Sequence, residues 1–243
     1  MRIVSRTHVG LVRENNEDSL LVKKPHLFAV ADGMGGYAAG EVASRAALRA
    51  FEVGLHNAGD NLQEALAKAF AKANSHVVKM ASGGSNLTGM GATLTALYLQ
   101  DKCTGYCCHI GDSRLYLWRG GELKQLTEDH TVVAGLCSEG KITAAEAKVH
   151  PMRHMLLKAV GVSEQTTPDI FKITFQPGDR VLLCSDGLTD MLEYEEIKEL
   201  LSGENSEEVA VALEEKALEN GGRDNISVIM IDFSEEGSVG RYE

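Results

Sequence analysis

Four aspartates recur in one local setting, at the end of an apolar segment beside a turn residue. They follow LFAVA, YCCHIG and VLLCS or precede NISVIM, and they are Asp32, Asp112, Asp186 and Asp224. A strand buried in a sheet holds its terminal side chain at the sheet edge, and glycine lets the backbone turn away there. Carboxylates gathered at one edge repel one another unless cations neutralise them. Oxygen donors without a histidine or cysteine set favour Mg²⁺ or Mn²⁺ over zinc or copper.

Each aspartate taken alone has a simpler interpretation. Asp-Gly is a common turn sequence, and a single instance is more often structural than functional. Four aspartates at strand ends shift the weight towards a cation site. The sequence leaves open whether they converge in space.

Composition limits the partners of such a site. The chain has 243 residues, of which 24 are basic and 35 acidic, so the formal net charge is −11. This charge repels phosphate backbones and anionic lipid, so we expect no nucleic acid and no membrane partner. No apolar run approaches the roughly 18 residues of a spanning helix, and the first residues turn polar too soon for a signal peptide. Five cysteines without a small disulfide framework fit free thiols, and we expect a cytoplasmic protein.

Hydrophobic patterns predict the elements that must position the aspartates. Short β-branched runs predict strands at 2–9, 19–22, 27–31, 93–99, 104–110, 113–126, 169–175, 180–184 and 226–233, with a hairpin turn at Gly120 and Gly121. Helical spacing predicts helices at 39–55, 61–80, 193–201 and 206–219. In the first helix the predicted apolar stripe is Val42, Ala46, Ala50 and Phe51, and a loop is predicted at 83–86.

The order of these elements indicates the fold class. Strand clusters separated by paired helices favour antiparallel sheets covered by helices over a doubly wound sheet. The length and near-average apolar content predict one globular domain over residues 1–243. The segment 128–160 is polar and weakly periodic, so it predicts short helices or a mobile subdomain. Adjacent Cys107 and Cys108 would point to opposite faces of a strand, which favours core cysteines over a zinc site.

Six motifs in order resemble a known family. They are RENNEDS at 13–19, DGMGG at 32–36, GATL at 91–94, HIGDSR at 109–114, SDGL at 185–188 and RDNIS at 223–227. Their order and spacing, over about residues 2–232, resemble the bacterial branch of the metal-dependent serine/threonine protein phosphatases, type 2C. One such motif is weak, whereas six in order are specific.

The resemblance implies an α+β fold, a four-layer α-β-β-α sandwich of two antiparallel sheets flanked by helix pairs. It implies two to three divalent cations, Mn²⁺ or Mg²⁺, between the sheets at one end. It also implies that 128–160 is a small flap subdomain within the catalytic domain.

Matching motif positions implies a role for each acid. Asp32 resembles the carboxylate that bridges two metals, the Gly33 carbonyl binds one of them, and Asp186 with Asp224 completes the other. Asp112 with Asp186 resembles a third, weaker metal site.

Three further residues take implied roles near the N-terminus. Glu17 and Asp18 match an acidic pair that holds metal-bound waters, and Arg13 matches the arginine that grips the substrate phosphate. Water shared by two divalent cations loses its proton readily, which supplies a nucleophile at neutral pH. The prediction is therefore hydrolysis of phosphoserine and phosphothreonine in proteins by a metal-bridging hydroxide, with Arg13 and Asp32 as catalytic residues.

The expected partners are phosphorylated proteins, including a serine/threonine kinase, and we expect a monomer. The alternative is a catalytically silent regulatory binding module of the same fold. Retention of Arg13, Asp32, Asp186 and Asp224 argues against silence, because a module without activity has no chemical need for all four.

Two positions depart from the family pattern and leave the proton donor for the leaving group unassigned. Many eukaryotic members have a histidine where this chain has Met34, and several bacterial relatives have one where it has Tyr37. Metal-bound water is the first candidate for the acid. A histidine of 128–160, His154 or His150, is the second, and its simpler interpretation is a surface residue of a polar loop.

Overall fold

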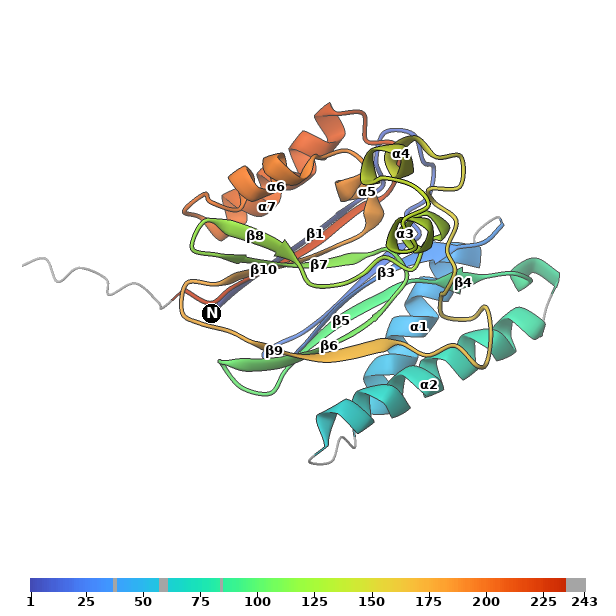
Figure 1. Ribbon diagram of the computed structural model, residues 1–243. Coiled ribbons are helices and arrows are strands. Elements are labelled where there is room, and N and C mark those ends of the chain that lie inside the picture. The colour runs from blue at the N-terminus through green and yellow to red at the C-terminus, as the bar shows by residue number, and fades with distance from the viewer. Residues whose placement is uncertain (37–38, 57–60, 84, 235–243) are drawn as a thin grey trace, which may run out of the picture.

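The computed structural model describes residues 1–36, 39–56, 61–83 and 85–234. Two antiparallel sheets lie face to face with helices on both outer sides (Figure 1). The first sheet has the order β1 (Arg2–His8), β11 (Ile226–Asp232), β10 (Arg180–Cys184), β7 (Arg114–Arg119) and β8 (Glu122–Gln125). The second has the order β2 (Asp18–Lys23), β3 (Leu27–Met34), β5 (Leu94–Leu99), β6 (Thr104–Ile110) and β9 (Asp169–Thr174), and the short β4 (Gly91–Ala92) pairs with β3. The predicted α+β sandwich is confirmed.

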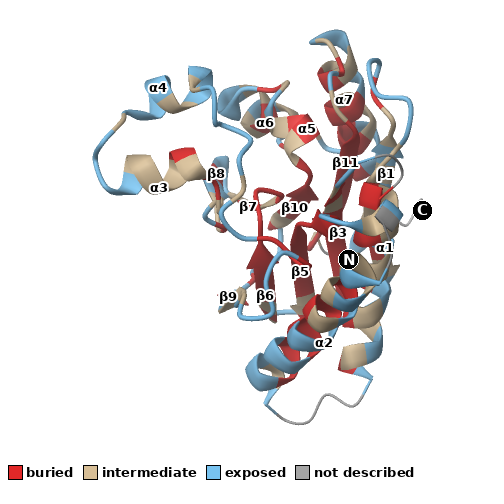
Figure 2. Ribbon diagram, turned by 90° about the vertical axis from the view of Figure 1, so that its right-hand side faces the viewer, coloured by how far each residue is buried: buried red, intermediate tan, exposed pale blue. Residues whose placement is uncertain are grey.

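Three layers of apolar side chains hold these elements together, and Figure 2 shows the sheets as the most buried part of the molecule. The layer between the sheets includes Phe28, Val30, Leu97, Leu183 and Ile229. One outer layer lies between the second sheet and its helices, and the other between the first sheet and its helices. Central strands are therefore buried on both faces, which explains why their sequences are continuously apolar instead of alternating.

The helix pair α1 (Ala39–Leu55) and α2 (Leu62–Ser82) covers the second sheet. Asn61 caps α2 by accepting a hydrogen bond from Glu64 N–H, as the sequence indicates. The predicted stripe on α1 is wrong in part, because Phe51 is buried but the other three residues are only partly buried. The buried face instead carries Ala43, Ala47 and Leu48 beside Phe51. Small residues on several faces of α1 give the pattern no single apolar side, so packing on β3 and α2 selects the face.

The helices α6 (Tyr194–Leu200) and α7 (Ser206–Glu219) cover the first sheet, and the one-turn helix α5 (Asp186–Thr189) follows β10. Two segments differ in detail from the prediction. Part of the expected 83–86 loop belongs to a 3₁₀ turn at Ser85–Leu87. β3 runs to Met34 instead of ending near 31, because Gly33 and Met34 pair with β4. Asp32 and Gly33 thus lie within a hydrogen-bonded strand.

The segment 128–160 contains the short helices α3 (Val132–Ser138) and α4 (Ala144–Val149), which project from the body in Figure 2. Its two ends are tied together, because Val132 N–H donates to Met155 O at 2.9 Å and Leu157 N–H to His130 O at 2.7 Å. The end of the segment is also attached to the second sheet, because Val160 and Ala92 of β4 exchange backbone hydrogen bonds. The segment is therefore a compact excursion between β8 and β9.

Two smaller predictions concern the hairpin and the cysteines. Gly120 and Gly121 adopt φ values of +57° and +88° in the turn between β7 and β8, as a tight hairpin requires. Cys107 packs in the layer between the sheets, whereas Cys108 packs under the helices. Both are core cysteines on opposite faces of β6, as predicted. No helix within the described ranges has the length and apolar character needed to cross a bilayer.

Candidate functional site

Two acids from the second sheet form the floor of the site. Asp18 of β2 and Asp32 of β3 are directly opposite in the antiparallel register, which places their Cβ atoms about 5 Å apart. Asp32 N–H donates to Thr93 Oγ1 at 2.8 Å. Ser185, at the end of the other sheet, donates through Oγ to Asp18 Oδ2 at 2.7 Å. This last bond links the two sheets at the depth of the acids.

The first sheet delivers two more acids to the same place. Asp186 opens α5 just after β10, and Asp224 precedes β11, the antiparallel neighbour of β10. The carboxyl groups of Asp186 and Asp32 lie close enough for each to shift the pKa of the other. Asp112, after β6, lies close enough to both for their charges to interact. The structure therefore brings the four predicted aspartates of strand ends together.

Burial and mutual repulsion set the protonation of these acids. Desolvation raises the pKa of Asp186 to about 6 and the pKa of Asp18 to about 7, and neighbouring carboxylates add to both shifts. Desolvation likewise raises the pKa of Asp32 and of Asp112 above the ordinary range. Without a counter-charge, these groups resist ionisation at neutral pH.

Unpartnered oxygen atoms test whether cations fit this cluster. Asp18 Oδ1 and Asp186 Oδ1 are buried and have no hydrogen-bond partner within the described part of the chain. Leaving such oxygens unsatisfied is costly. A divalent cation would satisfy them and relieve the repulsion between the acids, and an all-oxygen donor set suits Mg²⁺ or Mn²⁺. The residues present therefore fit the predicted cations.

Gly33 stands where the backbone and the Glu17 side chain approach closely. A Cβ on Gly33 would meet the Glu17 carbonyl oxygen at 2.8 Å, and one on Gly40 would meet Glu17 Oε2 at 2.5 Å and the Gly33 carbonyl oxygen at 2.7 Å. The Glu17 carboxylate lies against Gly40, and burial raises the pKa of Glu17 although Arg13 opposes the shift. Glu17 and the Gly33 carbonyl are thus neighbours at the start of α1.

Arg13 lies at the exposed side of the cluster. Its Nη2 donates to Asp224 Oδ2 at 2.7 Å, and 53% of its side chain is exposed. The charges of Asp32 and Glu17 also act on the guanidinium. A planar guanidinium binds two oxygens of one anion. Arg13 is therefore within reach of an anion that arrives from solvent.

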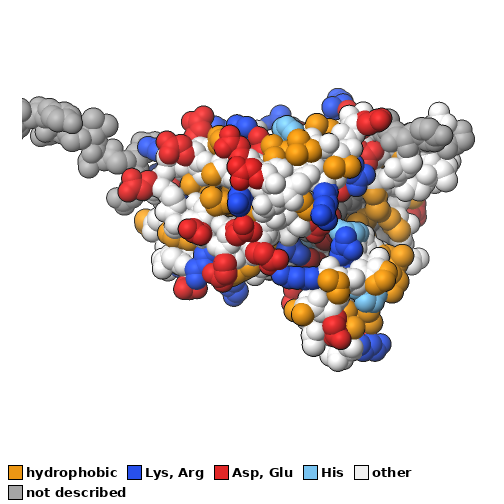
Figure 3. All heavy atoms as spheres, turned by 90° about the horizontal axis from the view of Figure 1, so that it is seen from above, with side chains coloured by type: hydrophobic (Ala, Val, Ile, Leu, Met, Phe, Trp, Pro, Cys, Tyr) orange, Lys and Arg blue, Asp and Glu red, His pale blue; other side chains and the backbone are white. Residues whose placement is uncertain are grey.

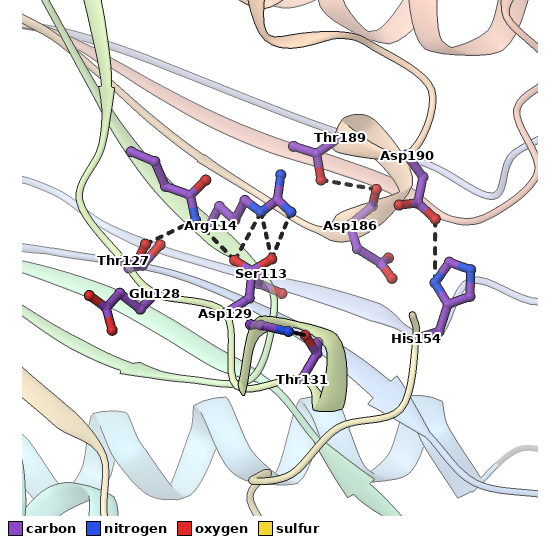
Figure 4. Close-up of polar contacts among 12 residues, drawn as sticks. Ser113, Arg114, Thr127, Glu128, Asp129, Thr131, His154, Asp186, Thr189 and Asp190 are labelled. Atoms are coloured by element: carbon purple, nitrogen blue, oxygen red, sulfur yellow. Dashed lines mark hydrogen bonds and ion pairs between the residues drawn. The ribbon is translucent and has the colours of Figure 1, made fainter. Parts of the chain in front are cut away.

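The structure places His154 beside an acid that the sequence analysis missed. His154 Nδ1 lies 3.5 Å from Asp190 Oδ2. One donor atom from each of His154, Asp186 and Asp190 lies within 4.8 Å of the others, and Figure 4 shows His154 facing these two acids. Asp190 follows Asp186 by four residues, so one helical turn brings it to the same side. That spacing was the signal in the sequence.

The other candidate histidine and the two departures from the family pattern have different settings. His150 Nδ1 accepts from Met152 N–H at 3.1 Å, which stabilises the turn after α4. Met34, at the end of β3, has a thioether that cannot donate a proton. Tyr37 lies outside the described residues.

A partly buried arginine adjoins the cluster on the side of Asp112. Arg114 donates to both carboxylate oxygens of Asp129 at 2.6–3.1 Å (Figure 4). Its charge partly offsets the effect of burial on the pKa of Asp112, which stays raised. Arg114 therefore forms its ion pair with Asp129 and does not neutralise Asp112.

The space-filling view shows the surface beside the projecting lobe. In Figure 3 a hollow separates the body from the projecting lobe, and carboxylates, cationic side chains and histidine meet along it. Such a mixture differs from the acidic side chains scattered over the body. Two sheets that converge on unpaired carboxylates, with an arginine at the rim, define a candidate metal-binding sandwich.

The family model for protein phosphatase 2C matches residues 7–217. The chain belongs to the protein phosphatase 2C family. The resemblance found in the six motifs is confirmed.

Solved structures and curated proteins agree with this assignment. The crystal structure of the Mycobacterium tuberculosis serine/threonine phosphatase PstP is 41% identical, with a TM-score of 0.90, over 96% of this chain and 99% of that one. A structure of the catalytic domain of PstP in complex with two manganese ions is 40% identical, with a TM-score of 0.87, over 96% and 98% of the two chains.

The curated relatives differ in length. PstP of M. tuberculosis strain H37Rv is 42% identical over 96% of this chain, yet the match covers 45% of PstP, so the chain spans about half the length of that relative. The serine/threonine phosphatase stp of Listeria innocua is 37% identical over 93% of this chain and 94% of its own length.

Proposed function

We propose that this protein hydrolyses phosphoserine and phosphothreonine in proteins with the help of divalent cations. The observation that carries the proposal is the group of buried, unpaired carboxylates between the sheets beside an exposed arginine. Relatives over nearly the whole chain are named serine/threonine phosphatases. Anionic substrate and acidic site are compatible only if cations and Arg13 reverse the local charge.

Each acid takes a part in holding the cations. Asp32, Asp186 and Asp224 would hold two Mn²⁺ or Mg²⁺ ions together with the Gly33 carbonyl, and Asp112 with Asp186 would hold a third, weaker one. When bound, these ions polarise phosphoryl oxygens and make water acidic enough to attack phosphorus at neutral pH.

The chain's own side chains orient the reactants. Glu17 and Asp18 lie directly behind these ligands, where their oxygens would accept hydrogen bonds from water in the site. Arg13 would leave Asp224 and bind two oxygens of the phosphate, because its single ion pair and half-exposed side chain leave it free to turn. This grip places phosphorus in line with the attacking water.

Protonation of the departing serine or threonine oxygen is assigned to His154. Its place beside Asp190 and Asp186 supports the assignment, because it brings an imidazole next to the acid cluster. Residues 128–160, which carry His154, act as a flap over the site within a single catalytic domain of residues 1–243. Water in the site is the alternative donor.

The test is hydrolysis of p-nitrophenyl phosphate and a phosphothreonine peptide with Mn²⁺, Mg²⁺ or chelator. We expect activity with either metal, none with chelator and none in Asp186→Ala. Activity that survives chelation would overturn the cation requirement. No activity under any condition, with phosphopeptide still bound, would favour the silent regulatory module of the same fold.

The physiological setting is proposed on the same basis. Substrates are phosphorylated proteins, including a serine/threonine kinase, and the protein works as a monomer in the cytoplasm. Light scattering at micromolar concentration tests the monomer, and a dimer mass would contradict it. Dephosphorylation of a phosphorylated kinase domain, compared with the same domain treated with Asp186→Ala, tests the substrate.

A further inference from the structure

Asn225, which the site described above does not use, connects three of its segments. It lies between Asp224 and the first residue of β11 and is 4% exposed. Its side-chain carbonyl accepts from Glu17 N–H at 2.7 Å. Its amide donates to Val9 O at 2.8 Å and to Asn15 O at 2.9 Å. All three partners are backbone groups of the 9–17 loop, which carries Arg13 and Glu17.

The amide of Asn225 has no capacity left for a ligand. A primary amide has two N–H donors, and both are used on the loop. The residue is also buried, so it does not reach substrate or a cation. Any influence it has on chemistry passes through the loop.

The backbone of Asn225 faces the metal-ligand side. Its N–H donates to Asp224 Oδ1 at 2.8 Å, and its carbonyl accepts from Ser185 Oγ at 3.4 Å. Gly187 packs so closely on this carbonyl that a Cβ would overlap it. One residue therefore touches the loop, Asp224 and the turn that holds Asp186.

Other contacts also hold this loop, and one of them is at Glu17, whose carbonyl oxygen accepts from Ser44 Oγ at 2.6 Å and from Gly33 N–H at 3.2 Å. Leu11 N–H donates to Gly222 O at 2.7 Å. Gly10, with φ of +83°, passes so close to the Asp224 carbonyl that a side chain would overlap it. Asn16 Nδ2 donates to Thr7 Oγ1 at 2.8 Å, but this contact is exposed. Among the described residues, Asn225 has the one buried side chain that hydrogen-bonds to the backbone of both residues 15 and 17.

We propose that Asn225 is a positioning residue that sets the Arg13 guanidinium and the Glu17 carboxylate relative to Asp224. The proposal rests on the proposed function, in which Arg13 binds phosphate. It predicts that losing the amide weakens the phosphate grip while leaving the metal ligands in place. A residue needed only for folding would lower the amount of active enzyme without changing how that enzyme binds phosphate.

The test compares Asn225→Leu and Asn225→Asp with wild type and with Asp232→Asn. Leucine keeps the volume without hydrogen bonds, and aspartate keeps the acceptor for Glu17 N–H but loses both donors. Asp232→Asn is the matched control, because it removes a buried polar contact at the other end of the same strand. We expect KM for a phosphothreonine peptide and Ki for inorganic phosphate to rise about tenfold in Asn225→Leu, and less in Asn225→Asp. Asp232→Asn should leave both constants unchanged.

Combination with Arg13→Ala shows whether the effect passes through the arginine. If it does, the double variant Arg13→Ala/Asn225→Leu has the KM of Arg13→Ala alone, because there is no guanidinium left to position. The proposal would be overturned if the double variant had a higher KM than Arg13→Ala alone. It would also be overturned if Asn225→Leu lowered kcat and left KM unchanged.

A readout without catalysis separates this proposal from the proposed function. Hydrogen exchange of the Glu17 amide should accelerate in Asn225→Leu and stay slow in Asp232→Asn. If wild type hydrolyses no phosphate ester, the proposed function fails, and the exchange and phosphate-binding results still decide whether Asn225 orders the loop. Unchanged exchange at Glu17 would reject the positioning role itself.

Discussion

Both ends of the sandwich bury aspartates, but within the described ranges only the buried aspartates at the far end form ion pairs with arginine. At the far end, Arg119 donates to both oxygens of Asp179 at 2.6 and 2.8 Å, and Arg180 and Ser206 donate to Asp232 at 3.2 and 2.7 Å. At the site end, the charges of Asp18, Asp112 and Asp186 all act on Asp32. The same strands, β10 and β11, connect the two ends.

The pKa values of the aspartates are shifted in opposite directions at the two ends. Hydrogen bonds and the Arg180 charge outweigh burial and lower the pKa of Asp232. Burial and neighbouring acids raise the pKa of Asp186 to about 6. A buried carboxylate with its own arginine serves the fold, whereas buried carboxylates without one need a ligand. Residue type and burial alone do not distinguish these cases; the counter-charge does.

The largest difference between the ends should be in catalysis. Asp32→Asn is expected to lower kcat/KM on a phosphothreonine peptide by about 10²–10³-fold, because it removes a charge that the proposed cations need. Asp179→Asn should stay within about twofold of wild type per folded molecule. Steady-state kinetics in saturating Mn²⁺, normalised to folded protein by circular dichroism, measures both. Equal losses at the two ends would contradict the division.

Stability should show the reverse order. Arg180→Met leaves Asp232 buried without its arginine and should cost about 3 kcal/mol of unfolding free energy. Asp186→Asn removes a repelled charge and should stabilise the metal-free protein by about 1 kcal/mol. Urea unfolding in chelator measures both values. If Asp186→Asn is instead as destabilising as Arg180→Met, repulsion between the site acids does not destabilise the metal-free protein.

The pH dependence of the metal-free protein should follow the site end. Folding raises the pKa of Asp186 to about 6 and of Asp18 to about 7, so the folded state binds more protons than the unfolded chain between about pH 4 and 7. Stability is therefore highest below this window and falls as pH rises, with a limiting slope of about 1.4 kcal/mol per pH unit for each proton.

Thermal melts from pH 5 to 8 measure this trend. In chelator, Tm should decrease with pH, and Asp18→Asn should flatten the curve. Saturating Mn²⁺ should abolish or reverse the decrease, because it binds the ionised acids. A metal-free Tm that rises over this range would mean that the aspartates are ionised without cations.

The smallest expected effect concerns His154, in the segment 128–160 that projects from the body. If His154 protonates the leaving oxygen, His154→Ala should lower kcat on a phosphothreonine peptide about tenfold and remove the alkaline limb of its pH profile. p-Nitrophenyl phosphate should be hardly affected, because nitrophenolate leaves without a proton. His150→Ala is the control and should change neither substrate. An unchanged alkaline limb in His154→Ala would leave water as the donor.

The sequence predicts the sandwich because most of its signals are local. Short β-branched runs, the Asn61 cap and the Gly120–Gly121 turn depend on neighbours in the chain, and all appear in the structure. The buried face of α1 was misjudged because alanines give little contrast between sides. The extension of β3 to Met34 depends on pairing with β4, some sixty residues away, which no local pattern contains.

The site was predictable to the extent that its residues share a setting. Strand-end aspartates and ordered motifs indicate which acids gather, and the structure gathers them. Asp190 escaped notice because it follows a short helix instead of standing at the end of a strand. The roles of Asn225 and of the arginines at the far end depend on contacts between distant segments, so no spacing in the sequence indicates them.

One consequence follows from the pairing of Arg180 with Asp232. These two residues are register partners at the far ends of β10 and β11. A slip of one residue would move Asp186 about 3.3 Å along the sheet relative to Asp224 and turn every side chain of one strand to the opposite face. The backbone register that brings Arg180 and Asp232 together at one end of the sheet is therefore the same register that fixes the spacing of Asp186 and Asp224 at the other end.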